Sequence, residues 1–142
     1  QMEAHGLFDP ALLVDAPMDA NSTARALGER LSTGGPLPTA FLAASEETAL
    51  GAVRALTGAG LRIPEDISLV SFNDTPLSAL VTPALTSVSI HVEEMGRSAV
   101  RLLAERAQLP GRSPVRTLPV KLVVPPTLVV RDSAAPPANR AR

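Results

Sequence analysis

The sequence predicts an α/β fold with an open, mostly parallel sheet flanked by helices. Short apolar runs alternate with longer segments in which apolar residues recur at spacings of three and four, the pattern of βαβ units. The 142 residues are about the length of one domain. Aromatic residues make up only 2% of the chain, so the core must be built from aliphatic side chains.

The first predicted unit is a strand followed by a helix. Residues 11–15, Ala-Leu-Leu-Val-Asp, form a short apolar run that we expect to be a strand. Asn21 or Ser22 is expected to cap the next helix through a side-chain oxygen. Leu27 and Leu31 would share the buried face of that helix, which would end at the Gly-Gly-Pro sequence that follows.

The pattern then repeats. Residues 39–44 predict a second strand and Ser45 the N-cap of a second helix. Glu46 and Glu47 place negative charge in the first helical turn, where the helix dipole favours it. A third strand at 67–72 is apolar at nearly every position, so we expect a central strand covered by helices on both faces.

The second half of the chain departs from this repeat. Residues 75–83 predict an irregular apolar loop, 85–90 a strand or an extended crossing segment, and 92–107 an amphipathic helix packed on the surface. The side chains expected to face inward from this helix are Val92, Met95, Ala99 and Leu102.

Two extended apolar runs, 115–124 and 128–130, close the predicted structure. We expect residues 1–133 to form one lobe of a larger domain. Residues 134–142 have little to bury and are expected to be a flexible tail.

Composition narrows the classes of function. The net charge of −1 predicts no basic surface for nucleic acid. The absence of cysteine excludes disulfides and thiolate metal sites. The longest apolar runs fall far short of the ~20 residues of a membrane span, and the first residues do not resemble a signal peptide. We expect a cytoplasmic protein that has no membrane partner and is part of a longer chain.

Catalytic motifs are missing from the sequence. It contains none of the phosphate-loop, dinucleotide, nucleophile-elbow or zinc-protease patterns. His91 has no evident nucleophile to activate. We therefore expect no enzymatic activity, no cofactor and no metal.

Polar residues follow the predicted strands. In doubly wound sheets, ligands bind outside the carboxyl ends of the strands. This rule selects residues 15–19, then Ser45 and Glu46, then Asn73 and Asp74, whose side chains suit a polyhydroxylated neutral ligand. Each also has a structural interpretation, because Ser45 could be a helix cap, Glu46 part of a solvated first turn and Asn73 part of a tight turn.

Several segments, in order along the chain, carry a resemblance to a known family. They are residues 38–56, 60–74, 82–88, 94–96 and 128–133, which include Gly-Leu-Arg-Ile-Pro-Glu-Asp-Ile-Ser-Leu-Val-Ser-Phe-Asn-Asp at 60–74. Together they closely resemble the C-terminal half of lac repressor-type (LacI/GalR family) transcription regulators. The resemblance covers about residues 38–133.

The resemblance implies a periplasmic-binding-protein-like effector domain of two α/β lobes, with a small molecule such as a sugar, a nucleoside or another metabolite in the cleft. This chain would be the C-terminal lobe, and operator DNA would be held only by an N-terminal domain outside it. Effector contacts would fall at Ser45, Asn73 and Ile90, where the family commonly has Asn, Asp and Gln. Asp19 lies near the usual position of an aromatic residue, and the strand-end rule adds Glu46.

The residues at these positions differ from those common in the family, which leaves two alternatives. Either the effector is less hydroxylated and more apolar than a sugar, or the protein responds weakly or to another molecule. The resemblance also implies a homodimer, and an apolar loop is itself expected to be covered by a partner. Our leading hypothesis is an effector-sensing, dimerising part of a bacterial transcription regulator; the alternative is a solute-binding protein of a sugar transporter. The implied dimer contacts are Leu50, Val53, Arg54, Leu77, Leu80 and Val81.

Overall fold

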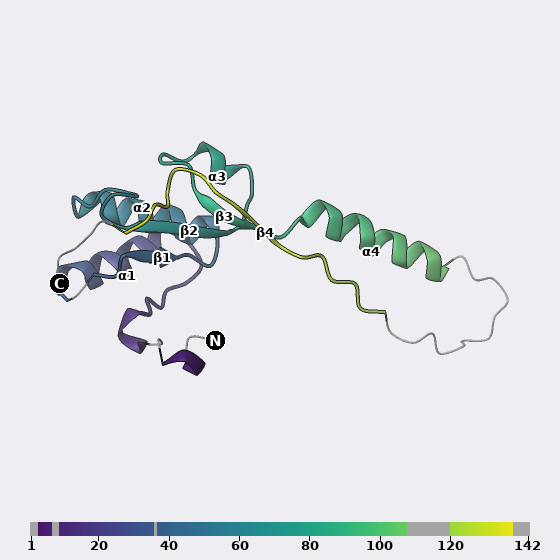
Figure 1. Cartoon of the computed structure of the whole chain (residues 1–142), viewed down its shortest axis with the longest axis horizontal. Coiled ribbons are helices and arrows are strands. Elements are labelled where there is room, and N and C mark those ends of the chain that lie inside the picture. Colours follow the sequence, from purple (N-terminus) through teal and green to yellow (C-terminus); the bar gives the residue numbers. More distant parts are fainter. Residues whose placement is uncertain (1–2, 7–8, 36, 108–119, 138–142) are drawn as a thin grey trace.

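The computed structural model describes residues 3–6, 9–35, 37–107 and 120–137. Its centre is a four-stranded sheet in the order β1-β2-β3-β4 (Figure 1). β1, β2 and β3 are parallel, and β4 is antiparallel to β3, so the predicted open, mostly parallel sheet is confirmed. The strands are β1 (Ala40–Leu42), β2 (Ser68–Asn73), β3 (Thr86–Ser89) and β4 (Thr127–Val129).

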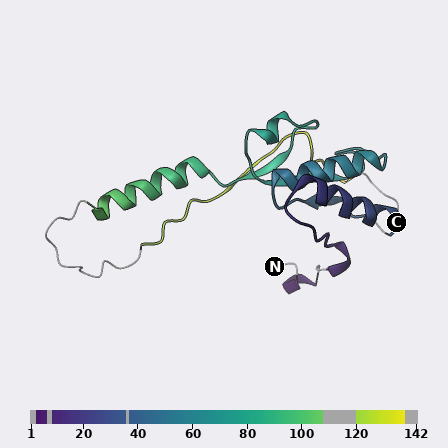
Figure 2. The same cartoon turned by 180° about the vertical axis from the view of Figure 1, so that it is seen from behind.

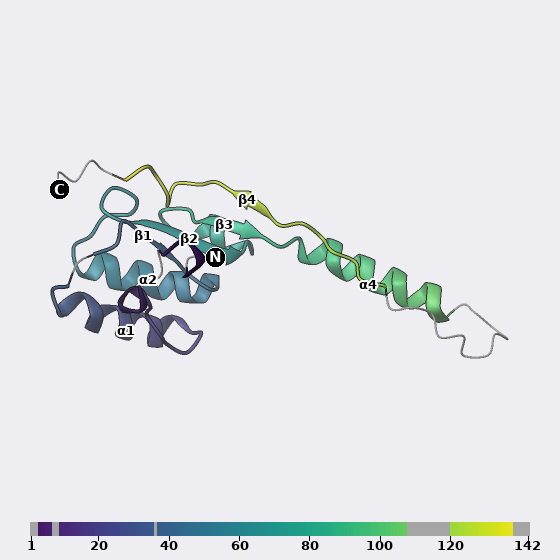
Figure 3. The same cartoon turned by 60° about the horizontal axis from the view of Figure 1, so that its bottom comes forward.

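Two long helices, α1 (Ala20–Ser32) and α2 (Glu46–Gly58), lie on the same side of the sheet (Figure 3). The core that they form with the sheet is aliphatic, as expected, and includes Leu27 of α1, Leu56 of α2 and Leu69 of β2. The helices approach so closely that a Cβ atom on Gly51 of α2 would lie 2.5 Å from the carbonyl oxygen of Ala20. Glycine at position 51 therefore sets the spacing between α1 and α2.

Side-chain caps start both helices. The predicted Ser45 cap of α2 is confirmed, because Ser45 Oγ accepts a 3.3 Å hydrogen bond from the Thr48 N–H and Thr48 Oγ1 accepts one of 2.9 Å from the Ser45 N–H. The prediction of Asn21 or Ser22 as the cap of α1 was wrong. The Asp19 carboxylate accepts hydrogen bonds from the N–H groups of both residues, at 3.0 and 2.8 Å, so the helix starts at Ala20.

Short helical turns replace two predicted features. The predicted strand at 11–15 was wrong: η2 (Pro10–Leu12) is a 3-10 turn capped by Asp9, and residues 13–15 belong to no strand. A short apolar run does not by itself distinguish strand from turn, and Asp-Pro favours a helical start. The predicted irregular loop contains α3 (Leu77–Leu80), and a further 3-10 turn, η1 (Glu3–His5), begins the described residues.

The helices cover one face of β2 only, so the expectation of helices on both faces is half met. Side chains alternate along a strand, and the strand register places Leu42, Phe72 and Leu128 together on the face opposite the core. Leu42 is 72% exposed and Phe72 38% exposed. This face is apolar and open to solvent over the part of the chain that the structure describes.

Helix α4 (Val92–Ala107) has the predicted bounds but extends away from the sheet, and residues 120–126 lead back to it (Figures 1 and 2). We call α4 and residues 120–126 the arm. None of the α4 residues is buried. The prediction that Val92, Met95, Ala99 and Leu102 face a packed surface was therefore wrong: the first three are exposed, Leu102 is only partly buried, and the described residues offer no surface opposite the helix.

Residues 133–135 lie beside the start of β2. Ser133 is fully buried, and the Ser68 hydroxyl donates to the carbonyl oxygen of Ala135. The lobe at 1–133 and the tail at 134–142 stay predictions. The part of the predicted run at 115–119 lies outside the described residues.

Candidate functional site

An open polar hollow of about 340 Å³ lies where β2 and β3 end and α4 begins. This is the carboxyl edge of the parallel strands, where the strand-end rule predicts a ligand. Asn73 ends β2, Ser89 ends β3, and the first turn of α4 closes one side. The lining residues are Asn73, Asp74, Ser89, His91, Val92, Glu93, Glu94 and Arg97.

Two consecutive residues leave β2 in the left-handed region. The φ angles of Asn73 and Asp74 are +96° and +58°, a conformation that Asn and Asp adopt more readily than other non-glycine residues. The Asp74 N–H donates a 3.2 Å hydrogen bond to Ser87 Oγ of β3. Asn73 is therefore both part of a tight turn and part of the wall of the hollow, so the two interpretations of this residue are compatible.

An ion pair that was not predicted from the sequence holds this turn in place. Arg131 Nη2 lies 2.8 Å from Asp74 Oδ1, and the two side chains are only 21% and 14% exposed. Asp74 Oδ1 has no aligned hydrogen-bond donor among the described residues, so this contact is mainly Coulombic. Arg131 Nη1 also donates a 2.7 Å hydrogen bond to the carbonyl oxygen of Leu85. The only signal in the sequence was the cation directly after the last predicted strand.

Glu46, a predicted effector residue, is 4% exposed and bonded within the protein. One of its oxygens, Oε1, accepts a 2.9 Å hydrogen bond from the Thr75 N–H and one of 3.1 Å from Ser78 Oγ. These bonds join the start of α2 to the loop that holds α3. Effector contact by Glu46 stays a prediction, and its observed contacts are with that loop.

Among the predicted effector residues, Asn73 lines the hollow, and Asp19, Ser45, Glu46 and Ile90 are not among its lining residues. Ser45 and Asp19 serve as helix caps. Hydrogen bonds from the backbone N–H and the hydroxyl of Ser22 hold the pKa of Asp19 below its ordinary value. Ile90 is half-buried beside Ser89. Contact of these four residues with a ligand stays a prediction.

His91 lies at the base of the arm. Its φ angle is +52°, and its Nε2 atom is 3.1 Å from Thr127 Oγ1 of β4. The hydrogen bond joins the two segments that leave and re-enter the sheet. His91 therefore has a structural partner as well as a place in the wall of the hollow.

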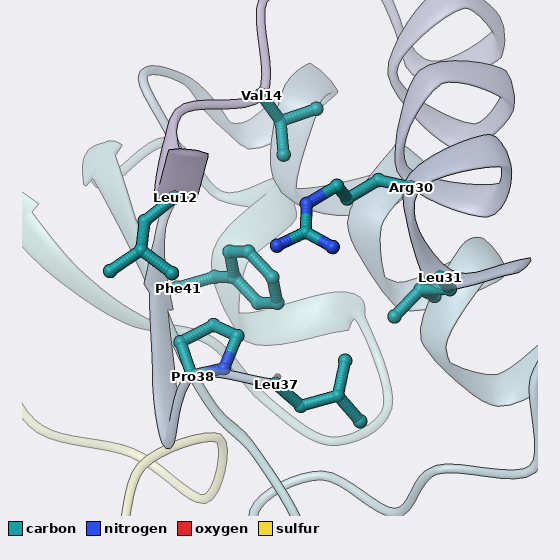
Figure 4. Close-up of a pocket in the computed structure, with 7 residues that line it drawn as sticks. All are labelled: Leu12, Val14, Arg30, Leu31, Leu37, Pro38 and Phe41. Carbon is teal, nitrogen blue, oxygen red and sulfur yellow. The ribbon is translucent and has the colours of Figure 1, made fainter. Parts of the chain in front are cut away.

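Further hollows flank β1 and are mainly apolar, and the largest of those described, about 350 Å³, includes Asp9, Ala40 and Leu42 in its wall. One of about 220 Å³ includes Leu13, Met18 and Leu42 in its wall. A smaller one, in Figure 4, has room for about one water molecule at most, at about 10 Å³, and Arg30 extends from α1 toward Phe41 there. The small recess is a packing gap and not a ligand site.

The predicted dimer residues form two groups, on α2 and around α3. Leu80 is 78% exposed, while Val53 and Val81 are partly buried against the core. Arg54 is exposed and donates a 2.8 Å hydrogen bond to Asn21 Oδ1 of α1. Leu50, the remaining α2 position, and Leu77 are partly exposed. The interface stays a prediction, and the exposure of Leu80 is consistent with it.

Within the described ranges, no three His, Asp or Glu side chains lie close enough to hold a metal ion. No helix of those ranges has the length and apolarity needed to cross a membrane.

An α/β lobe with a polar hollow at its strand ends is a ligand-binding architecture. Residues 1–134 match the family described as the periplasmic binding protein-like domain. The chain belongs to this family, and the predicted resemblance to LacI/GalR regulators is confirmed by its relatives. The HTH-type transcriptional regulator GalR of Streptococcus thermophilus is 38% identical over 112 residues, which are 79% of this chain and 34% of that protein.

Solved structures give the same result. A putative LacI-family transcriptional regulator from Sanguibacter keddieii superposes with a TM-score of 0.81 at 32% identity, over 93% of this chain and 48% of that one. A complex of the transcriptional regulator CelR with cellobiose superposes with a TM-score of 0.77 at 33% identity, over 94% of this chain and 39% of that one. The chain thus spans about a third to a half of the length of these relatives.

Proposed function

We propose that this chain is the effector-sensing and dimerising part of a LacI/GalR-type regulator of bacterial transcription. The curated relatives that support this proposal are HTH-type regulators. Because the chain spans only part of their length, the segment that holds operator DNA would lie elsewhere in a longer protein. The chain itself would be cytoplasmic and non-catalytic. The solute-binding alternative finds no support among these relatives.

The observation that carries the proposal is the arm beside the hollow. Val100 and Leu103 of α4, and Leu122 and Val123 of the returning segment, expose apolar side chains to solvent. A group of exposed apolar side chains on one projecting segment marks a surface that contacts a partner. A second lobe built around the arm would cover it, and the hollow at the base of the arm would then become one wall of a cleft.

The chemistry of the hollow favours a carbohydrate effector. The Asn73 amide both donates and accepts hydrogen bonds, as does the Ser89 hydroxyl, and Glu93 and Glu94 add acceptors. These groups match the hydroxyls of a neutral sugar. The CelR structure is a complex with cellobiose, and its similarity covers 94% of this chain. A nucleoside or another metabolite is the alternative.

Regulation would follow from the shared cleft. An effector that contacts both lobes favours one arrangement of the lobes over the other and so shifts the population between them. A homodimer through α2 and α3 would transmit that shift to the DNA-binding segments, and the coupling between effector and operator would be reciprocal.

The test is binding by the full-length protein. We expect isothermal titration calorimetry with a panel of carbohydrates, including cellobiose and ribose, to identify an effector that changes operator affinity. Asn73→Ala should weaken its binding by about tenfold or more, the effect of losing one or two hydrogen bonds in a desolvated site. Asn21→Ala, on α1 outside the hollow, is the matched control. A full-length protein with no sequence-specific DNA binding would refute the proposal.

A further inference from the structure

We propose that Arg131 positions the turn that carries Asn73, and that the affinity of the effector site depends on this cation although it lines no part of the hollow. The ligand-binding consequence rests on the proposed function. The structural consequence, a turn held in one conformation by Arg131, does not.

The turn needs an external constraint. Asn73 and Asp74 are consecutive non-glycine residues with positive φ, and such conformations persist only when the surroundings over-determine them. Two contacts do so here: the Asp74 N–H donates to Ser87 Oγ, and the Asp74 carboxylate pairs with Arg131. Without the ion pair, the turn would be free to relax toward conformations in which the Asn73 amide leaves the wall of the hollow.

Arg131 is suited to this role because both ends of its side chain are fixed. Its backbone N–H donates a 2.9 Å hydrogen bond to Thr86 Oγ1, and the Thr86 hydroxyl is 3.1 Å from its carbonyl oxygen. At the other end, the guanidinium holds Asp74 and the Leu85 carbonyl oxygen simultaneously. These two residues bound the loop that contains α3, so one side chain closes the loop at both ends.

The geometry requires arginine specifically. Two different nitrogens of one planar fork contact two acceptors on separate segments. The single ammonium of lysine is a point charge and cannot reproduce that pair of contacts from the same backbone position. Arg131→Lys should therefore retain the charge but only part of the constraint, and Arg131→Met should lose both.

The experiment uses the full-length protein and two measurements. Hydrogen-exchange mass spectrometry of the peptide covering 72–78 measures how stably the turn is held, without any ligand. Calorimetry measures the affinity for a carbohydrate of the panel, such as cellobiose, that the unaltered protein binds. We expect Arg131→Met to speed exchange in that peptide and to weaken binding by about tenfold or more, because the binding-competent turn becomes a minor population. Both the exchange rate and the affinity of Arg131→Lys should lie between those of the unaltered protein and those of Arg131→Met.

A matched control comes from the same segment. Ser133 donates to the Leu69 carbonyl oxygen and accepts from the Thr86 N–H, so Ser133→Ala removes two buried hydrogen bonds but neither of the two contacts that hold Asp74. It should lower the melting temperature without changing either readout. In Asp74→Asn, a further Arg131→Met change should have little added effect on binding, because the two residues act as a pair.

The outcomes are distinct. If Arg131→Met matches the unaltered protein in exchange and affinity, or only follows Ser133→Ala, the positioning role is refuted. If the unaltered protein binds none of the carbohydrates, the proposed function fails, and the exchange measurement still decides whether Arg131 holds the turn.

Discussion

The close approach of α1 to Gly51 of α2 makes a specific prediction for this residue. An alanine Cβ there would lie 2.5 Å from the Ala20 carbonyl oxygen and 2.7 Å from Thr23 Cβ. The first of these is a backbone atom of the facing helix and cannot move alone, so the helices must separate. Overpacking of this kind costs about 1–3 kcal/mol. The gain in helix propensity, at most about 1 kcal/mol, offsets only part of it.

Gly28 of α1 provides the matched control. It lies inside a helix, as Gly51 does, but a Cβ atom there would meet nothing within 4 Å. Gly28→Ala should therefore stabilise the protein by about 0.5–1 kcal/mol, the cost that glycine carries in a helix interior. The same chemical change is expected to have opposite signs at the two positions.

Urea denaturation followed by far-ultraviolet circular dichroism measures both free energies of unfolding. We expect Gly51→Ala to lower the midpoint and Gly28→Ala to raise it. Equal stabilisation by both variants would refute the close packing of α1 and α2 described above. Because α2 begins at Glu46, which is bonded to the loop after β2, separation of the helices should also shift that loop.

Three other predictions concern the loop, the dimer and acid stability. Glu46→Ala should destabilise the protein by about 1–3 kcal/mol in urea denaturation, because it leaves the Thr75 N–H and the Ser78 hydroxyl unpaired; Glu46→Gln retains an acceptor and should cost less, and equal losses would contradict this account. Leu80→Glu should weaken dimers of the full-length protein by about tenfold or more, since it would bury an unpaired charge, and unchanged sedimentation would count against the predicted interface. Asp19 has a lowered folded pKa, so its stabilisation of α1 is present above the ordinary value of 3.8 and is lost as pH falls through the folded pKa. Acid titration followed by circular dichroism should show this loss, and Asp19→Asn should reduce it; an identical acid transition in that variant would exclude the role.

Local chemistry made much of the fold predictable. The bounds of α4, the cap at Ser45 and the second and third strands follow from periodicity and capping chemistry within a few residues of each position. The predictions for the start of α1 and for residues 11–15 were wrong because several adjacent residues could satisfy the same local rules. Asp19, and not Asn21 or Ser22, caps the helix, and Pro10 favours a turn over a strand.

The candidate site also contains residues whose position was predictable from the sequence and residues whose position was not. Asn73 was predictable because it lies at the end of a buried strand, and parallel strands end at one edge of a sheet. The burial of Glu46 was not, because its partners Thr75 and Ser78 come from another segment of the chain. A charged residue in a first helical turn has the same local pattern whether it faces solvent or a loop.

The sequence by itself determined the class of fold, the family and the strand end that carries Asn73, since these depend on patterns of neighbouring residues. Only the tertiary structure decided that Arg131 reaches Asp74, that Gly51 lies against Ala20 and that α4 leaves the sheet with its apolar side chains exposed. Each of these joins residues far apart in the chain, or depends on a surface that the described residues do not provide. Such contacts depend on how the segments pack in space and leave no periodic signal along the sequence.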